Sequence, residues 1–183
     1  MVYILLGNGF EEAEALVAAD VLRRAELPVC LTGIGGEMVT GSHGIAVKTD
    51  KAVEAVTLSA GDMVVLPGGM GGVASIEGSE PAMALVRQAA EPGIWLAAIC
   101  AAPTLLARAG VLPQGVSCVC YPGMEGELAK AGAAPADRSV VKADGLITGR
   151  GPGSAFDFAL GLVEALAGKD TRSQVAGGLV YRK

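Results

Sequence analysis

The chain has 183 residues, of which 51% are hydrophobic and 18% are charged, and its formal net charge at pH 7 is −5. This length suits one domain with a sizeable core, and we expect a single domain over residues 1–183. The apolar composition argues against disorder, and the chain has no basic stripe that would favour a nucleic-acid partner.

The chain begins with a short apolar segment, Val2–Leu6, that lacks a basic flank and is predicted to be a strand, not a signal peptide. Four cysteines without a secretory signal indicate free thiols in a reducing compartment. The apolar run around Cys100 has about fifteen residues before Arg108, below the roughly 18 that suggest a membrane span. We therefore expect a cytoplasmic protein with no membrane partner.

A helix is predicted after the first strand, from about Phe10 to Ala25. Its apolar positions recur at helical spacing: Ala13, Leu16, Val17 and Val21. Carboxylates in a first turn complement the helix dipole, and that role suffices for two of the glutamates at positions 11, 12 and 14. The third can face the sulfur of Cys100 if both lie at the carboxyl edge of a parallel sheet.

The next segments continue the alternation of strands and helices. Val29–Ile34 and Met63–Leu66 are predicted as buried strands, and the segment from Gly35 to Val47 as a hairpin excursion that contains His43. Ser79 is predicted to cap a helix from about Glu80 to Ala90.

The glycine-rich turn Pro67-Gly68-Gly69-Met70-Gly71-Gly72 follows the strand Met63–Leu66. It lacks the spacing of a phosphate-binding loop. Two interpretations stay open: backbone N–H groups brought close to a ligand where no side chain intervenes, or an ordinary turn between strand and helix.

The second half of the chain contains three further predicted elements. Val116–Tyr121 is predicted as a strand with Cys118 and Cys120 on one face; the two are spaced unlike metal ligands, so we expect core packing and no metal site. Residues 140–148 predict a hairpin around Ala143-Asp144-Gly145. An amphipathic helix from Ala155 to Ala167 is predicted to stop at Gly168, followed by a short tail. The whole pattern predicts a doubly wound parallel sheet with ligands at the carboxyl ends of its strands.

The strongest functional signal surrounds Cys100. Ile94–Ile99 is predicted as a buried strand, and Pro103 is tolerated only in the first turn of a helix, so a helix begins just after Cys100. The small residues Ala98 and Ala102 suit a tight turn with an exposed nucleophile. The helix N-terminus would favour the thiolate. The alternative is a packed core cysteine, because free cysteines are commonly buried.

Several short motifs, specific in combination, occur in one order along nearly the whole chain: Gly9-Phe10-Glu11-Glu12-Ala13-Glu14, Asp20-Val21-Leu22-Arg23-Arg24-Ala25, Leu66-Pro67-Gly68-Gly69, Ala97-Ala98-Ile99-Cys100-Ala101-Ala102-Pro103 and Arg150-Gly151-Pro152-Gly153. In this combination the chain resembles the ThiJ/PfpI superfamily, most closely the branch with the human Parkinson-associated protein deglycase and its bacterial relatives. The resemblance implies a flavodoxin-like three-layer α/β/α sandwich with a mostly parallel sheet, a nucleophile-elbow cysteine and a homodimer.

The resemblance also implies a set of site residues. Cys100 matches the reactive cysteine, and Glu14 matches the carboxyl that hydrogen-bonds to its sulfur. A neutral carboxyl beside a thiolate donates a hydrogen bond that favours the thiolate. The backbone of Gly68, Gly69 and Ala101 would hold an oxyanion or substrate beside the sulfur.

The outer residues of the site depart from the family pattern. Tyr121 occupies the place of a histidine near the sulfur in many members, and we expect it to contact substrate. Ala101 replaces the histidine that follows the cysteine in the protease-like branch, and no histidine follows Cys100. Protease and amidotransferase activities therefore lack their general base. His43, expected in a surface loop, and Arg24 are possible residues at the mouth of the site.

Three classes of function stay open from the sequence. The first is slow, cofactor-free detoxification of a reactive aldehyde such as methylglyoxal, or of its glycated adducts, with Cys100 as nucleophile and Glu14 moving the protons. The second is an oxidative-stress sensor or chaperone that acts through oxidation of Cys100. The third is a catalytically idle family member that acts through its dimer surface.

Overall fold

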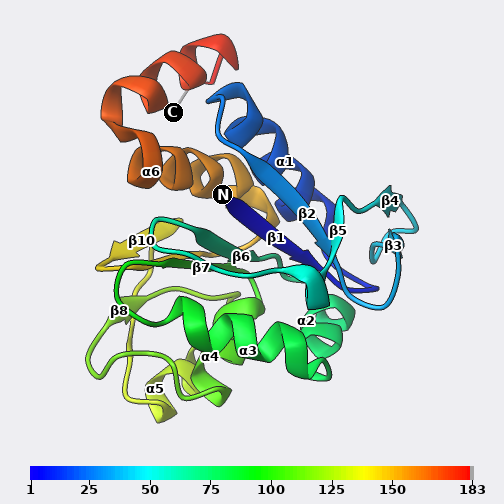
Figure 1. Ribbon diagram of the computed structural model, residues 1–183. Coiled ribbons are helices and arrows are strands. Elements are labelled where there is room, and N and C mark those ends of the chain that lie inside the picture. Colours follow the sequence, from blue (N-terminus) through cyan, green and yellow to red (C-terminus); the bar gives the residue numbers. More distant parts are fainter. Residues whose placement is uncertain (182–183) are drawn as a thin grey trace.

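The computed structural model describes residues 1–181 and shows a seven-stranded sheet between two layers of helices (Figure 1). The order of the strands is β10-β11-β7-β6-β1-β2-β5, and every neighbouring pair is parallel except β10 with β11. The strands are β1 (Val2–Leu6), β2 (Val29–Gly33), β5 (Lys51–Ala52), β6 (Met63–Leu66), β7 (Trp95–Ile99), β10 (Val140–Ala143) and β11 (Leu146–Gly149).

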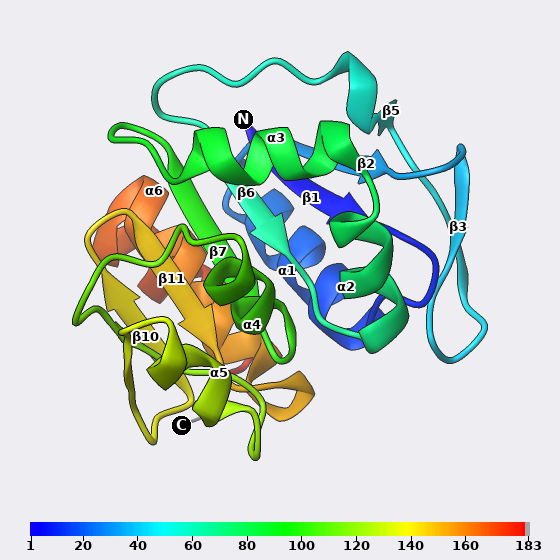
Figure 2. The same ribbon diagram turned by 90° about the horizontal axis from the view of Figure 1, so that it is seen from below.

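Helices cover both faces of the sheet, which is why its central strands are apolar along their whole length. One layer consists of α1 (Glu12–Arg24) and α6 (Ala155–Gly178). The other consists of α2 (Met70–Glu77), α3 (Glu80–Ala89), α4 (Ala102–Arg108) and α5 (Glu125–Lys130). Figure 2, which views the sheet through this second layer, shows α2, α3 and α4 in front of the strands.

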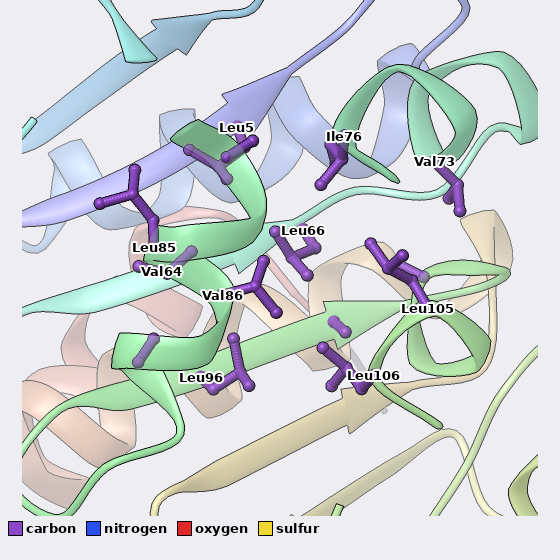
Figure 3. Packing of buried hydrophobic residues seen from close by; sticks show 14 of the residues in the cluster. Leu5, Val64, Leu66, Val73, Ile76, Leu85, Val86, Leu96, Leu105 and Leu106 are labelled. Carbon is purple, nitrogen blue, oxygen red and sulfur yellow. The ribbon is translucent and has the colours of Figure 1, made fainter. Parts of the chain in front are cut away.

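Each layer has its own apolar cluster against the sheet. In the cluster under α2, α3 and α4, leucines from the strands meet leucines and valines from the helices, as Figure 3 shows for Leu66, Val86 and Leu105. Phe158 of α6 is fully buried in the cluster on the other face. The predicted α/β/α sandwich is confirmed, as are the strands from Val2, Met63 and Ile94 to within a residue.

Short elements outside the sheet complete the fold. Strands β3 (Met38–Thr40) and β4 (Ala46–Lys48) form the predicted antiparallel hairpin, with His43 in its turn. Ser79 caps α3 as predicted, because its hydroxyl accepts the Ala82 N–H at 3.3 Å. The remaining elements are β8 (Ser117–Cys118), β9 (Ala134–Pro135) and the short 3₁₀ helices η1 (Val53–Ala55) and η2 (Pro152–Ser154).

The predicted apolar face of α1 is wrong. Ala13 is exposed and Leu16 and Val17 are only partly buried, although Val21 is buried as expected. The buried face instead carries small or acidic residues, because α1 packs closely on α6: Glu12, Glu14, Ala15, Ala18, Ala19, Val21 and Leu22. Hydrophobic periodicity cannot indicate a face that contains two carboxyl groups.

The predicted strand Val116–Tyr121 is also wrong in extent. Only Ser117–Cys118 forms a strand, and it pairs with β9 outside the main sheet. The backbone N–H groups after Cys118 do not pair with β9. The Val119 N–H donates to the Thr148 hydroxyl at 2.9 Å, and the Tyr121 N–H donates to the Cys100 carbonyl at 2.8 Å. The predicted core packing of Cys118 and Cys120 is confirmed.

The helix from Ala155 ends at Gly168 as predicted, but the segment after it, predicted as a short tail, forms a second helical segment of α6. Gly168 has a φ of 85° and kinks the chain, but helical structure resumes as far as Gly178. The segment after the kink folds back, so that the Tyr181 hydroxyl donates to Asp157 Oδ1 at 2.6 Å. Helix α2, which the glycine-rich sequence after Leu66 did not predict, is the other additional element. Within residues 1–181, no helix is both long and apolar enough to cross a bilayer.

Candidate active site

Cys100 lies on a strained turn between β7 and α4, at the carboxyl edge of the sheet. Its φ of 65° is in the left-handed region, which side chains rarely adopt. The backbone is held on both sides, because the Cys100 N–H donates to the Gly149 carbonyl at 3.0 Å and the Cys100 carbonyl accepts the Tyr121 N–H at 2.8 Å. The thiol is partly exposed, whereas the other cysteines are buried: Cys30, Cys118 and Cys120. The sharp turn predicted between strand and helix is confirmed.

Glu14 reaches the cysteine from the first turn of α1. Its side chain is buried, and Oε2 accepts the Gly68 N–H at 2.6 Å. The other oxygen, Oε1, is buried and has no hydrogen-bond partner within residues 1–181. Burial raises the pKa of Glu14 to about 7, although the Gly68 N–H and Cys100 act to lower it. The carboxyl therefore holds its proton up to neutral pH.

Gly68 determines how closely these two side chains approach each other. A Cβ atom at position 68 would lie 2.6 Å from Cys100 Cβ and 2.7 Å from Glu14 Oε2. It would also lie 3.1 Å from Cys100 Sγ. The carboxyl and the thiol thus occupy the space in front of a residue that has no side chain, and the Gly68 N–H holds Glu14.

Burial raises the pKa of the Cys100 thiol to about 12, and the charge and hydrogen bond of Glu14 add to the rise. The backbone N–H groups of Ala101 and Gly69 act in the opposite direction by stabilising the thiolate. The sequence predicted that the helix N-terminus lowers the pKa of Cys100. This prediction is wrong for the state in which Glu14 is ionised. Burial and the neighbouring carboxylate destabilise the thiolate more than the helix N-terminus stabilises it.

The pair carries a single negative charge between the first proton loss, near pH 7, and the second, near pH 12. If Glu14 keeps the remaining proton, the sulfur is the anion, with the Ala101 and Gly69 N–H groups and the carboxyl O–H beside it. If the sulfur keeps the proton, the charge lies on the buried Glu14 carboxylate, which accepts hydrogen bonds from the Gly68 N–H and the Cys100 thiol. The Ala101 and Gly69 N–H groups beside the sulfur are the donors that favour the first arrangement.

Gly69 brings its N–H to the sulfur through a conformation that only glycine adopts readily. It has a φ of 81° and precedes the first residue of α2. A Cβ there would lie 2.4 Å from the Gly9 carbonyl oxygen and 2.7 Å from the Glu11 nitrogen. Of the two interpretations of this turn, backbone N–H groups presented to a reacting atom fits the geometry.

His43 lies in the exposed turn of the β3–β4 hairpin, as the sequence predicted, and it contacts α1. Its N–H donates to Glu12 Oε1 at 2.7 Å, and its Nδ1 lies 2.8 Å from Glu12 Oε2. Burial acts to raise the Glu12 pKa, but the hydrogen bonds of His43 and neighbouring backbone lower it to about 2. Glu12 and His43 are thus joined by hydrogen bonds, and Glu11 Oε2 lies 3.8 Å from His43 Nδ1. Glu12 thus does more than complement a helix dipole.

Tyr121 borders the site, whereas Arg24 does not lie near it in the same chain. Tyr121 is 47% exposed and lines a cavity of about 270 Å³ with Arg150, Gly151 and Pro152, a cavity whose lining does not include Cys100 or Glu14. Arg24 lies at the far end of α1, where it pairs with Asp20 at 2.8 Å. About 15 Å of helix separates it from Glu14. The expectation that Arg24 lies at the mouth of the site is wrong within one chain, because α1 points away from Cys100.

A flavodoxin-like sheet, a cysteine on a strained elbow and a buried acid from the first helix define a class of α/β protein by its fold and by this cysteine–carboxyl arrangement. Residues 1–165 match the model of the DJ-1/PfpI family, so the chain belongs to that family. The family predicted from the motifs of the sequence is confirmed.

Known relatives match this chain along most of its length. The chain is 43% identical over 178 residues to protein dj-1beta of Drosophila melanogaster, covering 97% of this chain and 95% of the relative. It is 33% identical over 173 residues to the glutathione-independent glyoxalase DJR-1.2 of Caenorhabditis elegans, covering 94% and 91%.

Solved structures of relatives confirm the flavodoxin-like fold. The crystal structure of Drosophila melanogaster DJ-1beta matches with a TM-score of 0.91 at 40% identity, covering 100% of this chain and 98% of that one. A structure of oxidized Toxoplasma gondii DJ-1 matches with a TM-score of 0.92 at 32% identity, with the same coverage.

Proposed function

We propose that this protein detoxifies small reactive aldehydes such as methylglyoxal, or their early adducts, by a slow, cofactor-free, glyoxalase- or deglycase-type reaction. The observation that carries the proposal is the contact of Cys100 with a buried Glu14 that keeps its proton up to about pH 7. The name of the Caenorhabditis elegans relative, a glutathione-independent glyoxalase, supports the same chemistry.

The first step in this mechanism is addition of the Cys100 thiolate to the aldehyde carbon. A carbon–sulfur bond forms, the carbonyl π bond breaks, and the electron pair moves to oxygen. The N–H groups of Ala101 and Gly69, which stabilise the thiolate, are placed to stabilise this oxyanion as well. Glu14 then gives its proton to the oxygen, which produces a neutral hemithioacetal and a carboxylate.

The second step is an internal redox transfer that requires no external oxidant. Glu14, now a carboxylate, removes the proton from the former aldehyde carbon and passes it to the oxygen of the neighbouring carbonyl, so that an enediol forms. Glu14 then removes the proton of the first hydroxyl and delivers it to the neighbouring carbon, which gives a lactoyl thioester on Cys100 and leaves Glu14 a carboxylate. Water hydrolyses the thioester to lactate and the free thiol, so the sum is methylglyoxal plus water to lactic acid.

One carboxyl carries every proton transfer in this scheme. Ala101 and Tyr121 occupy the places of histidines in related branches, and Glu14 is the acid–base group that the site places beside the sulfur. We therefore expect a low turnover number, since general acid–base catalysis typically contributes about 10²–10⁴-fold per group.

The test is conversion of methylglyoxal to lactate by the parent and by Cys100→Ser, with Cys30→Ser as a control that replaces a buried cysteine. The proposal requires the Cys100 variant to lose the activity and the Cys30 variant to keep it. A Cys100→Ser protein that forms lactate as fast as the parent would eliminate the proposal.

A second candidate function is an oxidative-stress sensor or chaperone, favoured by the difference in exposure among the cysteines. Cys100 is partly exposed, whereas Cys30, Cys118 and Cys120 are buried. Its thiolate would attack hydrogen peroxide, forming a sulfur–oxygen bond and releasing hydroxide, and a protonated Glu14 could hydrogen-bond to the oxidised sulfur. The oxidized Toxoplasma gondii relative supports this candidate. Mass spectrometry after mild peroxide treatment tests it: oxidation of Cys118 or Cys120 before Cys100 would exclude it.

Reactivity toward iodoacetamide separates both candidates from an idle family member. Rapid labelling of Cys100 near neutral pH supports either candidate, and an unreactive Cys100 would indicate a protein that acts through its surface alone. We also propose a cytoplasmic homodimer, which sedimentation at several concentrations would test.

A further inference from the structure

Glu11 is a second carboxyl that lies close to the reactive pair. It is placed one helical turn before Glu14, and residues three apart share one face of a helix. The Glu11 N–H donates to the Gly68 carbonyl at 3.0 Å, so Glu11 is fixed to the residue whose own N–H holds Glu14. Its side chain is only 16% exposed, so its charge is poorly screened by water.

His43 is the basic side chain that faces Glu11. Its Nδ1 lies 3.8 Å from Glu11 Oε2 and 2.8 Å from Glu12 Oε2. The hairpin turn that carries it is anchored to the chain before α1, because the Ser42 N–H donates to the Phe10 carbonyl at 2.8 Å. The position of the imidazole is thus fixed by the backbone as well as by the carboxylates.

We propose that Glu11 and His43 act as a tuning pair that sets how firmly Glu14 holds its proton, and thereby the pH at which Cys100 becomes reactive. Glu11 is a positioning residue here, because it acts on the sulfur through Glu14. The inference rests on the proposed reactivity of the Cys100–Glu14 pair and adds the control of that same site by the hairpin.

Electrostatics fixes the direction of each effect. The titratable groups that face Glu14 are Cys100 and Glu11, and those that face His43 are Glu11 and Glu12. A charged Glu11 disfavours a second negative charge on Glu14 and so raises its pKa. Protonated His43 offsets the charge of Glu11, and Glu12 and Glu11 in turn raise the His43 pKa. Loss of the Glu11 charge should therefore make it easier for the Cys100–Glu14 pair to lose its first proton, and loss of the His43 charge should make it harder.

The experiment is the pH dependence of iodoacetamide labelling of Cys100 in the parent, in Glu11→Gln and in His43→Gln. Both replacements keep a polar side chain of similar size. Glu54→Gln, which neutralises an exposed carboxylate on η1, is the control for a change in net charge. Labelling needs no aldehyde, so the result does not depend on whether the protein turns over methylglyoxal.

We expect the labelling midpoint of Glu11→Gln to fall by about 0.3–1 pH unit and that of His43→Gln to rise by a similar amount. Glu54→Gln should match the parent. A merely structural role would not shift the midpoint in opposite directions. Coincident midpoints for Glu11→Gln and the parent, or shifts of the same sign in both variants, would overturn the inference. A parent whose Cys100 is not labelled at any pH would instead refute the proposed reactive pair.

Discussion

Replacement of Gly68 by alanine should separate the reactive pair without a change in charge. The added Cβ would lie 2.6 Å from Cys100 Cβ and 2.7 Å from Glu14 Oε2, about 1 Å closer than ordinary carbon contacts allow. Gly68 does not have a positive φ, so alanine suits its backbone and the effect arises from the contact alone. The two side chains must move apart, since both are held by packed elements.

The expected cost in stability is about 1–3 kcal/mol, the usual range for an extra methyl group in a packed site. That corresponds to a fall of roughly 2–4 °C in Tm per kcal/mol for a chain of this size. The activity should fall further, by about 100-fold, because a displacement of 1 Å between reacting groups costs that much.

The assay compares lactate formation, Cys100 labelling and Tm for the parent, Gly68→Ala and Gly153→Ala. Gly153 is the matched control, because a Cβ at this position meets no atom within 4 Å and the residue lies on the rim of the cavity beside Tyr121. The reasoning requires Gly153→Ala to behave as the parent. It is refuted if Gly68→Ala retains the parental rates of both reactions.

Three further substitutions test other parts of the structure. Glu14→Gln should still allow labelling of Cys100 but lose lactate formation by at least about 100-fold, because an amide donates a hydrogen bond without transferring a proton. Glu12→Gln should lower stability at neutral pH but not near pH 2. The pKa of Glu12 in the folded protein is about 2, below the ordinary 4.5, so its ionised form stabilises the fold above pH 4.5 and this stabilisation is lost as the pH falls to 2. Parallel acid unfolding curves for the parent and Glu12→Gln would contradict this. Thr148→Val should cost about 1–3 kcal/mol in chemical denaturation, since the buried Val119 N–H loses its acceptor, whereas Thr148→Ser should not.

The central strands were predictable because helices cover them on both faces. Complete burial gives an unbroken apolar run, as in Val2–Leu6 and Met63–Leu66. The elbow was predictable for a local reason, since Pro103 restricts where a helix can begin and small neighbours allow the sharp turn at Cys100. These signals depend on residues adjacent in the sequence.

The parts that sequence did not predict depend on contacts between distant segments. The buried face of α1 carries Glu12 and Glu14, and their burial follows from the hairpin and from Gly68, which lie far away along the chain. The role of Gly149 in holding the Cys100 N–H was missed because it requires the register of β11 against β7. No local pattern indicates such a register.

The protonation of the pair is a further property that sequence patterns misjudge. A helix end suggests a thiol with a lowered pKa, but burial and Glu14 raise the Cys100 pKa. The protonation state that makes Cys100 reactive therefore depends on Cys100 and Glu14 together, because they share one proton. A sequence motif around either residue alone cannot predict this state.

The most direct test is the ultraviolet absorbance of the Cys100 thiolate as a function of pH, taken as the difference between the parent and Cys100→Ser. If the sulfur bears the charge once the pair loses its first proton, thiolate absorbance appears with a midpoint near pH 7, where Glu14 would otherwise titrate. Absorbance that appears only near pH 12 would show that the carboxylate bears the charge and the thiol stays protonated, which contradicts the account.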